Sequence, residues 1–284
     1  MEDFEGLPDE RLAPFANTYF WYEKPLADFA TVLANVVLVT MGETRVFVEG
    51  RQTPAGMTYC AVHEPAVVNY SKTEGPMFAV RLMPGAFDRL FHIDPRKANG
   101  VTAASEADHR LTRLHTALLD TPRDAAQQFR TADRVLLDLL RNAKPANLAD
   151  RFVDLVSKEG GALELSGAAQ RLGCSLRTLE RACAARFART PKRIARGIRA
   201  ARTFHLEEKR GQRAETMAEF SYADLPHYLN DMRRITGRNR SQHAAEGERE
   251  RERGVIRLWP GGAVAQGEEE RARWEKLREK RYRL

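Results

Sequence analysis

The chain has 284 residues, a length that favours two domains. Its ordinary apolar content of 43% predicts that it folds. It contains no apolar run near the ~20 residues of a membrane helix, and its acidic start, MEDFEGLPDERLAPF, is not that of a signal peptide. We therefore expect a cytoplasmic protein. The three cysteines, Cys60, Cys174 and Cys183, are too few for a disulfide framework or a zinc site, and we expect them to be reduced and partly packed.

Charge is distributed unevenly along the chain. Residues 1–150 carry 16 Lys and Arg against 20 Asp and Glu, whereas residues 151–284 carry 30 against 19. Within residues 171–240 the counts are 17 and 7, and Arg supplies 15 of the 17. Because Arg makes bidentate contacts with phosphate and guanine, a polyanion is a candidate partner of this half. A merely soluble basic surface would give the same composition.

The first part of the chain has the pattern of a β domain. Short apolar runs, separated by Gly and Pro, predict the strands of a small antiparallel sandwich or barrel. These runs are residues 29–40, 45–49, 58–62, 66–70 and 78–83. Pro84 and Gly85 then end the last strand and begin a helical segment over 86–91.

Two longer amphipathic helices are predicted next, over residues 105–119 and 122–142, the second with Pro122 in its first turn. Their apolar stripes are formed by Leu111, Leu114 and Leu118, and by Phe129, Ala132, Val135, Leu136, Leu139 and Leu140. The stripes fit either an intramolecular core or a dimer seam.

The domain boundaries follow from changes in this pattern. We expect an N-terminal domain over residues 1–142 that binds a small ligand or dimerises, and a linker over 143–150 centred on Lys144 to Asn147. A helical domain would occupy 151–241. The tail over 242–284 contains two charge-dense segments, 246–254 and 266–284, so we expect a solvated helix or disorder there.

Residues 165–187 predict a helix-turn-helix hairpin. A helix over 166–172 is followed by Gly173, which suits the left-handed backbone that closes a helix, and Ser175 is a favourable N-cap for the next one. The inner face of that second helix would hold Leu179, Ala182, Cys183 and Phe187. Its outer face would hold Leu176, Arg177, Glu180, Arg181 and Ala184. Such a helix fits the major groove of DNA, although many helical hairpins share the pattern.

The same pattern then returns. Residues 213–220 predict a short helix, 221–224 a turn, and 225–234 a second reader helix with Tyr228 and Met232 inward. Residues 191–206 between the two hairpins predict one helix. A helix of that kind would place the two readers about one DNA turn apart, roughly 34 Å, on one face of the duplex.

With both hairpins in place, the sequence resembles the AraC/XylS family of transcription regulators over residues 163–237. The resemblance implies two reader helices joined by a central helix, within an all-α tandem helix-turn-helix domain. The matching positions are Gly173, Ser175, Arg177, Leu179, Arg181, Phe187, Pro191, Ile198, Arg199, Ala201, Arg202, 222–224, 226–228, 232–234, Thr236 and Gly237. Residues 79–86 resemble the strand-to-helix step of one family branch, in which a cupin-like domain precedes the readers. The implied fold is therefore α+β: an N-terminal cupin-like antiparallel β domain with a helical hairpin, then the helical domain.

The resemblance also implies partners and contact residues. The partners are double-stranded promoter DNA, RNA polymerase, a small-molecule effector and a second copy of the chain. The base-facing positions would be Arg177, Glu180 and Arg181 in the first reader and Leu225, Pro226, Leu229 and Asn230 in the second. The full set expected at DNA is Ser175, Arg177, Thr178, Glu180, Arg181, Asp224, Leu225, His227, Asn230, Arg233 and Arg234.

The sequence departs from the family pattern at several places. Ser221 stands where the family usually has Gly, and Asn230 where it usually has Arg. Arg240 lies near the place of an expected Pro, and the charged tail has no counterpart. These departures bear on the fit of the second reader to DNA.

Two other classes of function were weighed against DNA binding. A cupin-type enzyme would need three metal ligands, but His63 and Glu64 stand alone, and Cys60 with His63 lacks a third group to orient a nucleophile. We therefore expect neither an enzyme nor a bound metal or cofactor. The other class is a degenerate family member that acts only through protein contacts.

Overall fold

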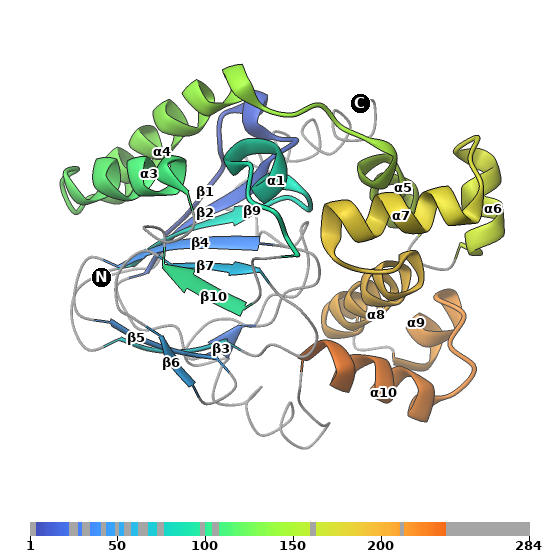
Figure 1. Cartoon of the computed structure of the whole chain (residues 1–284). Helices are drawn as coiled ribbons and strands as arrows, with labels where there is room; N and C mark the ends of the chain where they lie inside the picture. The colour runs from blue at the N-terminus through green and yellow to red at the C-terminus, as the bar shows by residue number, and fades with distance from the viewer. Residues whose placement is uncertain are drawn as a thin grey trace.

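The fold is taken from a computed structural model and has an α+β arrangement (Figure 1). Two antiparallel sheets occupy the first part of the chain, and the described residues from Leu148 onward are helical apart from their turns. The structure describes residues 4–22, 28–29, 35–40, 44–48, 51–53, 58–61, 68–72, 77–96, 100–103, 108–159, 163–210 and 213–236. The tail, Gly237 and the pair His63 and Glu64 lie outside these ranges.

A six-stranded and a four-stranded sheet form the β part. The larger has the order β1-β2-β9-β4-β7-β10 and the smaller the order β3-β8-β5-β6. The strands are β1 (Phe4–Gly6), β2 (Ala16–Tyr22), β3 (Asp28–Phe29), β4 (Asn35–Thr40), β5 (Thr44–Val48), β6 (Arg51–Thr53), β7 (Thr58–Ala61), β8 (Val68–Lys72), β9 (Met77–Leu82) and β10 (Gly100–Ala103). Every run predicted as β contains a strand, and the run over 29–40 contains parts of two, β3 and β4.

One central strand was not predicted. β2 pairs with β1 on one side and with β9 on the other, from Ala16 opposite Leu82 to Tyr22 opposite Met77. Its sequence, ANTYFWY, lacks β-branched residues apart from one Thr, and its buried Tyr19 and Trp21 were the available signal. The shorter β1, β6 and β10 were missed as well.

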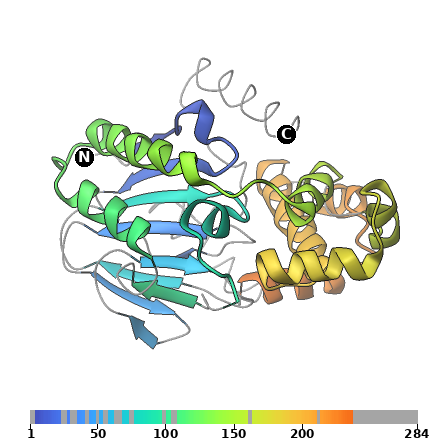
Figure 2. The same cartoon turned by 45° about the horizontal axis from the view of Figure 1, so that its top comes forward.

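Helices cover the side of the large sheet that faces away from the small one (Figures 1 and 2). These helices are α1 (Ala86–Phe91), α3 (His109–Leu119) and α4 (Ala125–Leu139), with short 3₁₀ turns η1 (Glu10–Leu12) and η2 (Leu140–Asn142). Both predicted apolar stripes pack into one hydrophobic core with the sheet, for example through Leu114 and Leu136, which are fully buried. Within the chain the stripes are therefore core.

The start of α4 differs from the prediction. The helix begins at Ala125 and not at Pro122. Asp124 is its N-cap, because the Asp124 carboxylate accepts a hydrogen bond from the Gln127 N–H at 2.9 Å. Phe129 of α4 then lies against Tyr19 and Phe78 of the sheet, with ring centroids 5.6 and 6.0 Å away.

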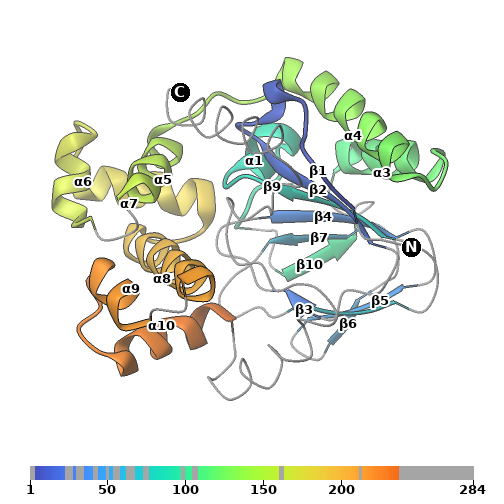
Figure 3. The same ribbon diagram turned by 180° about the vertical axis from the view of Figure 1, so that it is seen from behind.

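Six helices form the described C-terminal part, seen from behind in Figure 3. They are α5 (Leu148–Lys158), α6 (Leu165–Arg171), α7 (Leu176–Phe187), α8 (Pro191–Arg210), α9 (Arg213–Glu219) and α10 (Leu225–Thr236), and they enclose a second hydrophobic cluster. α5 begins inside the expected linker, because Asn147 and Asp150 form a reciprocal capping box. Within the described ranges, no helix has the length and apolarity that crossing a membrane requires.

Candidate nucleic-acid interface

The first helix-turn-helix unit consists of α6 and α7. Gly173 closes α6 with a left-handed φ of +66°, and the Cys174 N–H donates back to the Ala169 carbonyl at 3.0 Å. Ser175 then caps α7 by accepting a hydrogen bond from the Thr178 N–H at 3.1 Å. Both features follow the sequence-based expectation, and the turn between the helices is correspondingly tight.

One face of α7 packs inward and the other meets solvent. Leu179, Cys183 and Phe187 are buried, as predicted, and Ala182 is half-buried. The predicted outer residues are all exposed: Leu176, Arg177, Glu180, Arg181 and Ala184. Leu176 is 41% exposed, a large value for an apolar side chain.

The charged groups on this outer face are available to a ligand. Arg177 and Arg181 form no hydrogen bond or ion pair with any described residue, and neither does Glu180. Ser175 and Thr178 differ from them, since their hydroxyl oxygens lie 2.8 Å apart and serve the helix cap. The outer face of α7 thus offers two exposed guanidinium groups four residues apart, on one side of the helix.

The second unit, α9 and α10, repeats this geometry. Ser221 takes the left-handed conformation in the turn with a φ of +56°, and the Tyr222 N–H donates to the Met217 carbonyl at 3.0 Å. Asp224 caps α10 by accepting from the His227 N–H at 2.7 Å. The inward residues Tyr228 and Met232 are buried, as predicted.

The outer face of α10 is less basic at its N-terminal end than that of α7. Pro226 and Asn230 are exposed, whereas Leu225 and Leu229 are half-buried against the helical core. The exposed Arg233 and Arg234 lie in the last turn described. Among described residues, Asn230 and both arginines have no polar partner.

A buried carboxylate joins α10 to the connecting helix α8. Asp231 forms ion pairs with Arg196 and with Arg199, the latter at 3.3 Å, and accepts a hydrogen bond from the Tyr222 hydroxyl at 3.4 Å. The Arg199 guanidinium lies 4.4 Å above the Tyr222 ring. Burial, followed by the Asp231 charge, raises the pKa of Tyr222 well above its usual value. The cluster fixes α10 on α8.

His227 belongs partly to this cluster. Its Nε2 lies 4.0 Å from the Asp231 carboxylate and 3.5 Å from a guanidinium nitrogen of Arg199, and its ring meets Tyr222 edge-on at 5.2 Å. The sequence predicted His227 only as a DNA contact. The structure places it, half-exposed, where it also packs against the α8–α10 junction.

The connecting helix α8 has 20 residues, longer than the predicted 16-residue span 191–206. At 1.5 Å per residue it is about 30 Å long, and the two hairpins lie on either side of it (Figure 1). Its length is therefore comparable with one turn of DNA.

Charge counting overstated the positive charge available to a partner. Arg186, Arg196 and Arg199 lie in the basic region, yet all three pair with aspartates. A signal for Arg186 was present in the sequence, because it falls on the apolar face of α7, three residues after the buried Cys183. Asp231 likewise follows the buried Tyr228 by three residues.

The residues weighed for metal or nucleophilic chemistry, Cys60, His63 and Glu64, are not tested, because their side chains lie outside the description. No group of three His, Cys, Asp or Glu side chains gathers as metal ligands in the described ranges. Cys174 is half-buried, and burial raises the pKa of the Cys183 thiol to about 12.

Comparisons with known proteins gave structural matches alone. No protein-family model and no curated sequence matches the chain. A structure of ToxT from Vibrio cholerae matches with a TM-score of 0.44 and 7% identity, covering 85% of this chain and 96% of ToxT. The apo form of a ToxT variant from Vibrio cholerae matches with a TM-score of 0.47 and 8% identity, covering 79% of this chain and 95% of the ToxT chain. ToxT bound to an unsaturated fatty acid matches with a TM-score of 0.42 and 8% identity, covering 79% of this chain and 92% of the ToxT chain.

Proposed function

We propose that this protein is a sequence-specific DNA-binding transcription regulator of the AraC/XylS type. The observation that carries the proposal is the repeated helix-turn-helix unit. Each unit ends in an N-capped helix with a buried inner face and an exposed outer face, and α8 connects the two. The first outer face presents Arg177 and Arg181 without protein partners among the described residues.

The proposed contacts differ between the two readers. Arg177 and Arg181 suit guanine O6 and N7 or a phosphate, and Glu180 suits cytosine N4. In the second reader, Asn230 suits adenine, and Pro226 with the half-buried Leu225 and Leu229 can contact only thymine methyl groups. Arg233 and Arg234 lie at the far end of α10 and suit phosphate. Most of the sequence specificity is therefore assigned to α7.

The N-terminal part would supply control. Its sheets and helices have their own hydrophobic core, and we assign to it the binding of a small-molecule effector or a second copy of the chain. Sedimentation and a ligand thermal-shift screen of the full chain test this assignment. A monomeric chain that responds to no ligand would contradict it.

A selection of bound fragments from a random double-stranded DNA pool tests the main proposal. The full chain should enrich a bipartite site whose two half-sites lie about one helical turn apart, with stronger base preference in one half. Enrichment of no sequence would overturn sequence-specific binding. Recovery of a single half-site would show that only one of the two helices contacts bases.

A further inference from the structure

The N-terminal core and the first reader meet at a close junction. α1 approaches α5 and α7 so tightly that a Cβ atom at Gly85 would lie 2.6 Å from Oδ1 of Asp150 and 3.5 Å from the Phe187 ring. Gly85 also has a left-handed φ of +80°. Glycine is thus required at this position on two grounds, space and backbone conformation.

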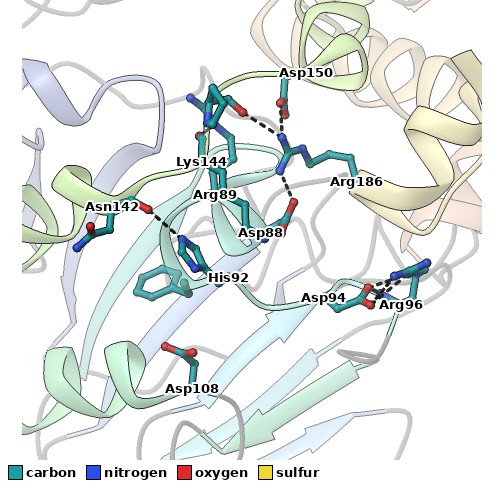
Figure 4. Close-up of polar contacts among 12 residues, drawn as sticks. Asp88, Arg89, His92, Asp94, Arg96, Asp108, Asn142, Lys144, Asp150 and Arg186 are labelled. Carbon is teal, nitrogen blue, oxygen red and sulfur yellow. Dashed lines mark hydrogen bonds and ion pairs between the residues drawn. The ribbon is translucent and has the colours of Figure 1, made fainter.

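Arg186 of α7 is the centre of this junction (Figure 4). Its side chain is 3% exposed, and it pairs with Asp88 of α1 and with Asp150 of α5, the latter at 3.0 Å. It also donates to the Pro145 carbonyl at 3.2 Å. One guanidinium group therefore contacts the N-terminal core, the connecting segment and the helical part together.

The connecting segment is held by the same group of residues. Lys144 pairs with Asp88 at 2.5 Å, its N–H donates to the Arg89 carbonyl at 2.9 Å, and its own carbonyl accepts from Arg89 Nε at 3.1 Å. Asn142 adds a contact between its carbonyl and His92 Nε2 at 3.0 Å. The segment between α4 and α5 is bound to α1 by backbone and side chain, unlike a free linker.

The junction is electrostatically incomplete despite these contacts. Oδ1 of Asp150 and Nε of Arg186 are buried without a hydrogen-bond partner. Burial raises the pKa of Asp150, although the Asn147 N–H and Arg186 both favour its ionised form. Buried ion pairs whose hydrogen-bonding groups are not all satisfied add little to stability compared with apolar packing. Stabilisation alone is therefore a weak explanation for the presence of Arg186 and its two aspartates at the junction.

We infer that Arg186 is a positioning residue, which couples the orientation of reader helix α7 to helix α1 of the N-terminal core through Asp88. This inference rests on the proposed DNA-binding function and names how that site is controlled. A change in the N-terminal core that moves α1 moves Asp88, and the buried guanidinium transmits the displacement to α7. By linkage, DNA bound at α7 must in turn stabilise α1.

The first test uses the free, full-length protein and hydrogen exchange at the Lys144 amide. Asp88→Asn removes the charge shared by Arg186 and Lys144. Asp138→Asn is the matched control, since Asp138 also holds two cations, Arg113 and Arg141, but on α3 and η2. Asp88→Asn should speed exchange at Lys144 about tenfold, the loss expected for one charge-assisted hydrogen bond, and Asp138→Asn should not. Equal exchange rates at the Lys144 amide in the wild type, Asp88→Asn and Asp138→Asn would overturn the proposed role of Asp88 at this junction.

The second test adds DNA carrying the selected site. Binding should slow amide exchange in α1 of the wild type, and Asp88→Asn should bind DNA but lose this remote protection. If the wild type binds DNA and exchange in α1 stays the same, the coupling is wrong while the proposed function stands. If the wild type binds no DNA, the proposed function falls and the coupling to a reader falls with it.

Arg186→Lys separates charge from geometry. A Lys side chain keeps the positive charge but cannot bridge two carboxylates and a carbonyl with a planar fork. It should retain the folded state and give partial remote protection of α1. Full protection with Lys would show that the charge suffices and that Arg186 does not set an orientation.

Discussion

Two residues in the helical part make a testable contribution to stability, and the first is Ser221, whose backbone is left-handed. Its φ of +56° is a left-handed value that costs a residue with a Cβ atom about 1–2 kcal/mol. Ser221→Gly should raise the free energy of unfolding, by about 0.5–1 kcal/mol once the greater freedom of Gly in the unfolded chain is deducted. Denaturant unfolding measures the change.

Ser221→Ala is the control for that substitution, because it removes the hydroxyl and keeps the Cβ atom. It should give no such gain. A stabilisation as large with Ala as with Gly would show that the side-chain oxygen, and not the backbone, carries the cost.

The second is Cys183, whose buried thiol has its pKa raised to about 12. In the unfolded chain the thiol ionises near pH 8.5, so unfolding above that pH releases a proton and the folded state loses stability as pH rises toward about 12. Below about pH 8.5 this contribution is fully present. Cys183→Ala should flatten the decline of unfolding free energy between about pH 8.5 and 10. An unchanged slope in Cys183→Ala would contradict the assignment.

At the scale of single elements, local signals predicted most of the helical part. Gly173 and Ser175 marked the turn and the cap of the first hairpin because backbone conformation and N-capping depend on adjacent residues. The inward residues of α7 and α10 followed from helical spacing. The stripes of α3 and α4 were placed on helices, but only the structure shows that they face the sheet.

Contacts between distant residues could not be predicted in this way. The pairing of β2 with β9 joins residues about sixty positions apart, and the Arg186 to Asp88 pair joins residues 98 positions apart. The only sign of a buried ion pair in the sequence is a charged residue on an apolar helix face. The identity of its partner depends on the tertiary fold. The charge counts accordingly included Arg186, Arg196 and Arg199 as if they were available to DNA.

The proposed difference between α7 and α10 in their contacts with bases predicts different losses for two substitutions. Arg181→Ala should cost about 1–3 kcal/mol of binding free energy and relax preference at one base pair, because a base contact is lost. Asn230→Ala should have a smaller, also base-selective, effect. Titrations against sites mutated one base at a time measure both. Uniform weakening for Arg181→Ala, with the larger base-selective loss for Asn230→Ala, would reverse the assignment of the readers.

For the molecule as a whole, the arginines left unpaired predict salt-dependent binding. Each phosphate that the protein neutralises lowers the slope of log K against log salt by about 0.9. The slope should therefore be steep, but it should correspond to fewer contacts than the 17 basic residues within 171–240, since at least three of them are paired internally. Titrations at increasing salt give the slope, and a flat response would contradict contact with the DNA backbone.

The central claim, that the outer face of α7 reads DNA, is tested most directly by comparing two double substitutions. Arg177→Ala with Arg181→Ala removes two exposed arginines, four residues apart, from α7. Arg130→Ala with Arg134→Ala removes an equally spaced exposed pair, also without described partners, from α4. Net charge falls by the same amount in both proteins.

Affinity for the selected site should fall at least tenfold in the α7 variant, as loss of a base contact requires, and should stay near the wild-type value in the α4 variant. Fluorescence anisotropy at one fixed salt concentration measures both. Equal weakening of the two variants would show that DNA responds to net charge alone, and an unaffected α7 variant would place the DNA-binding surface elsewhere.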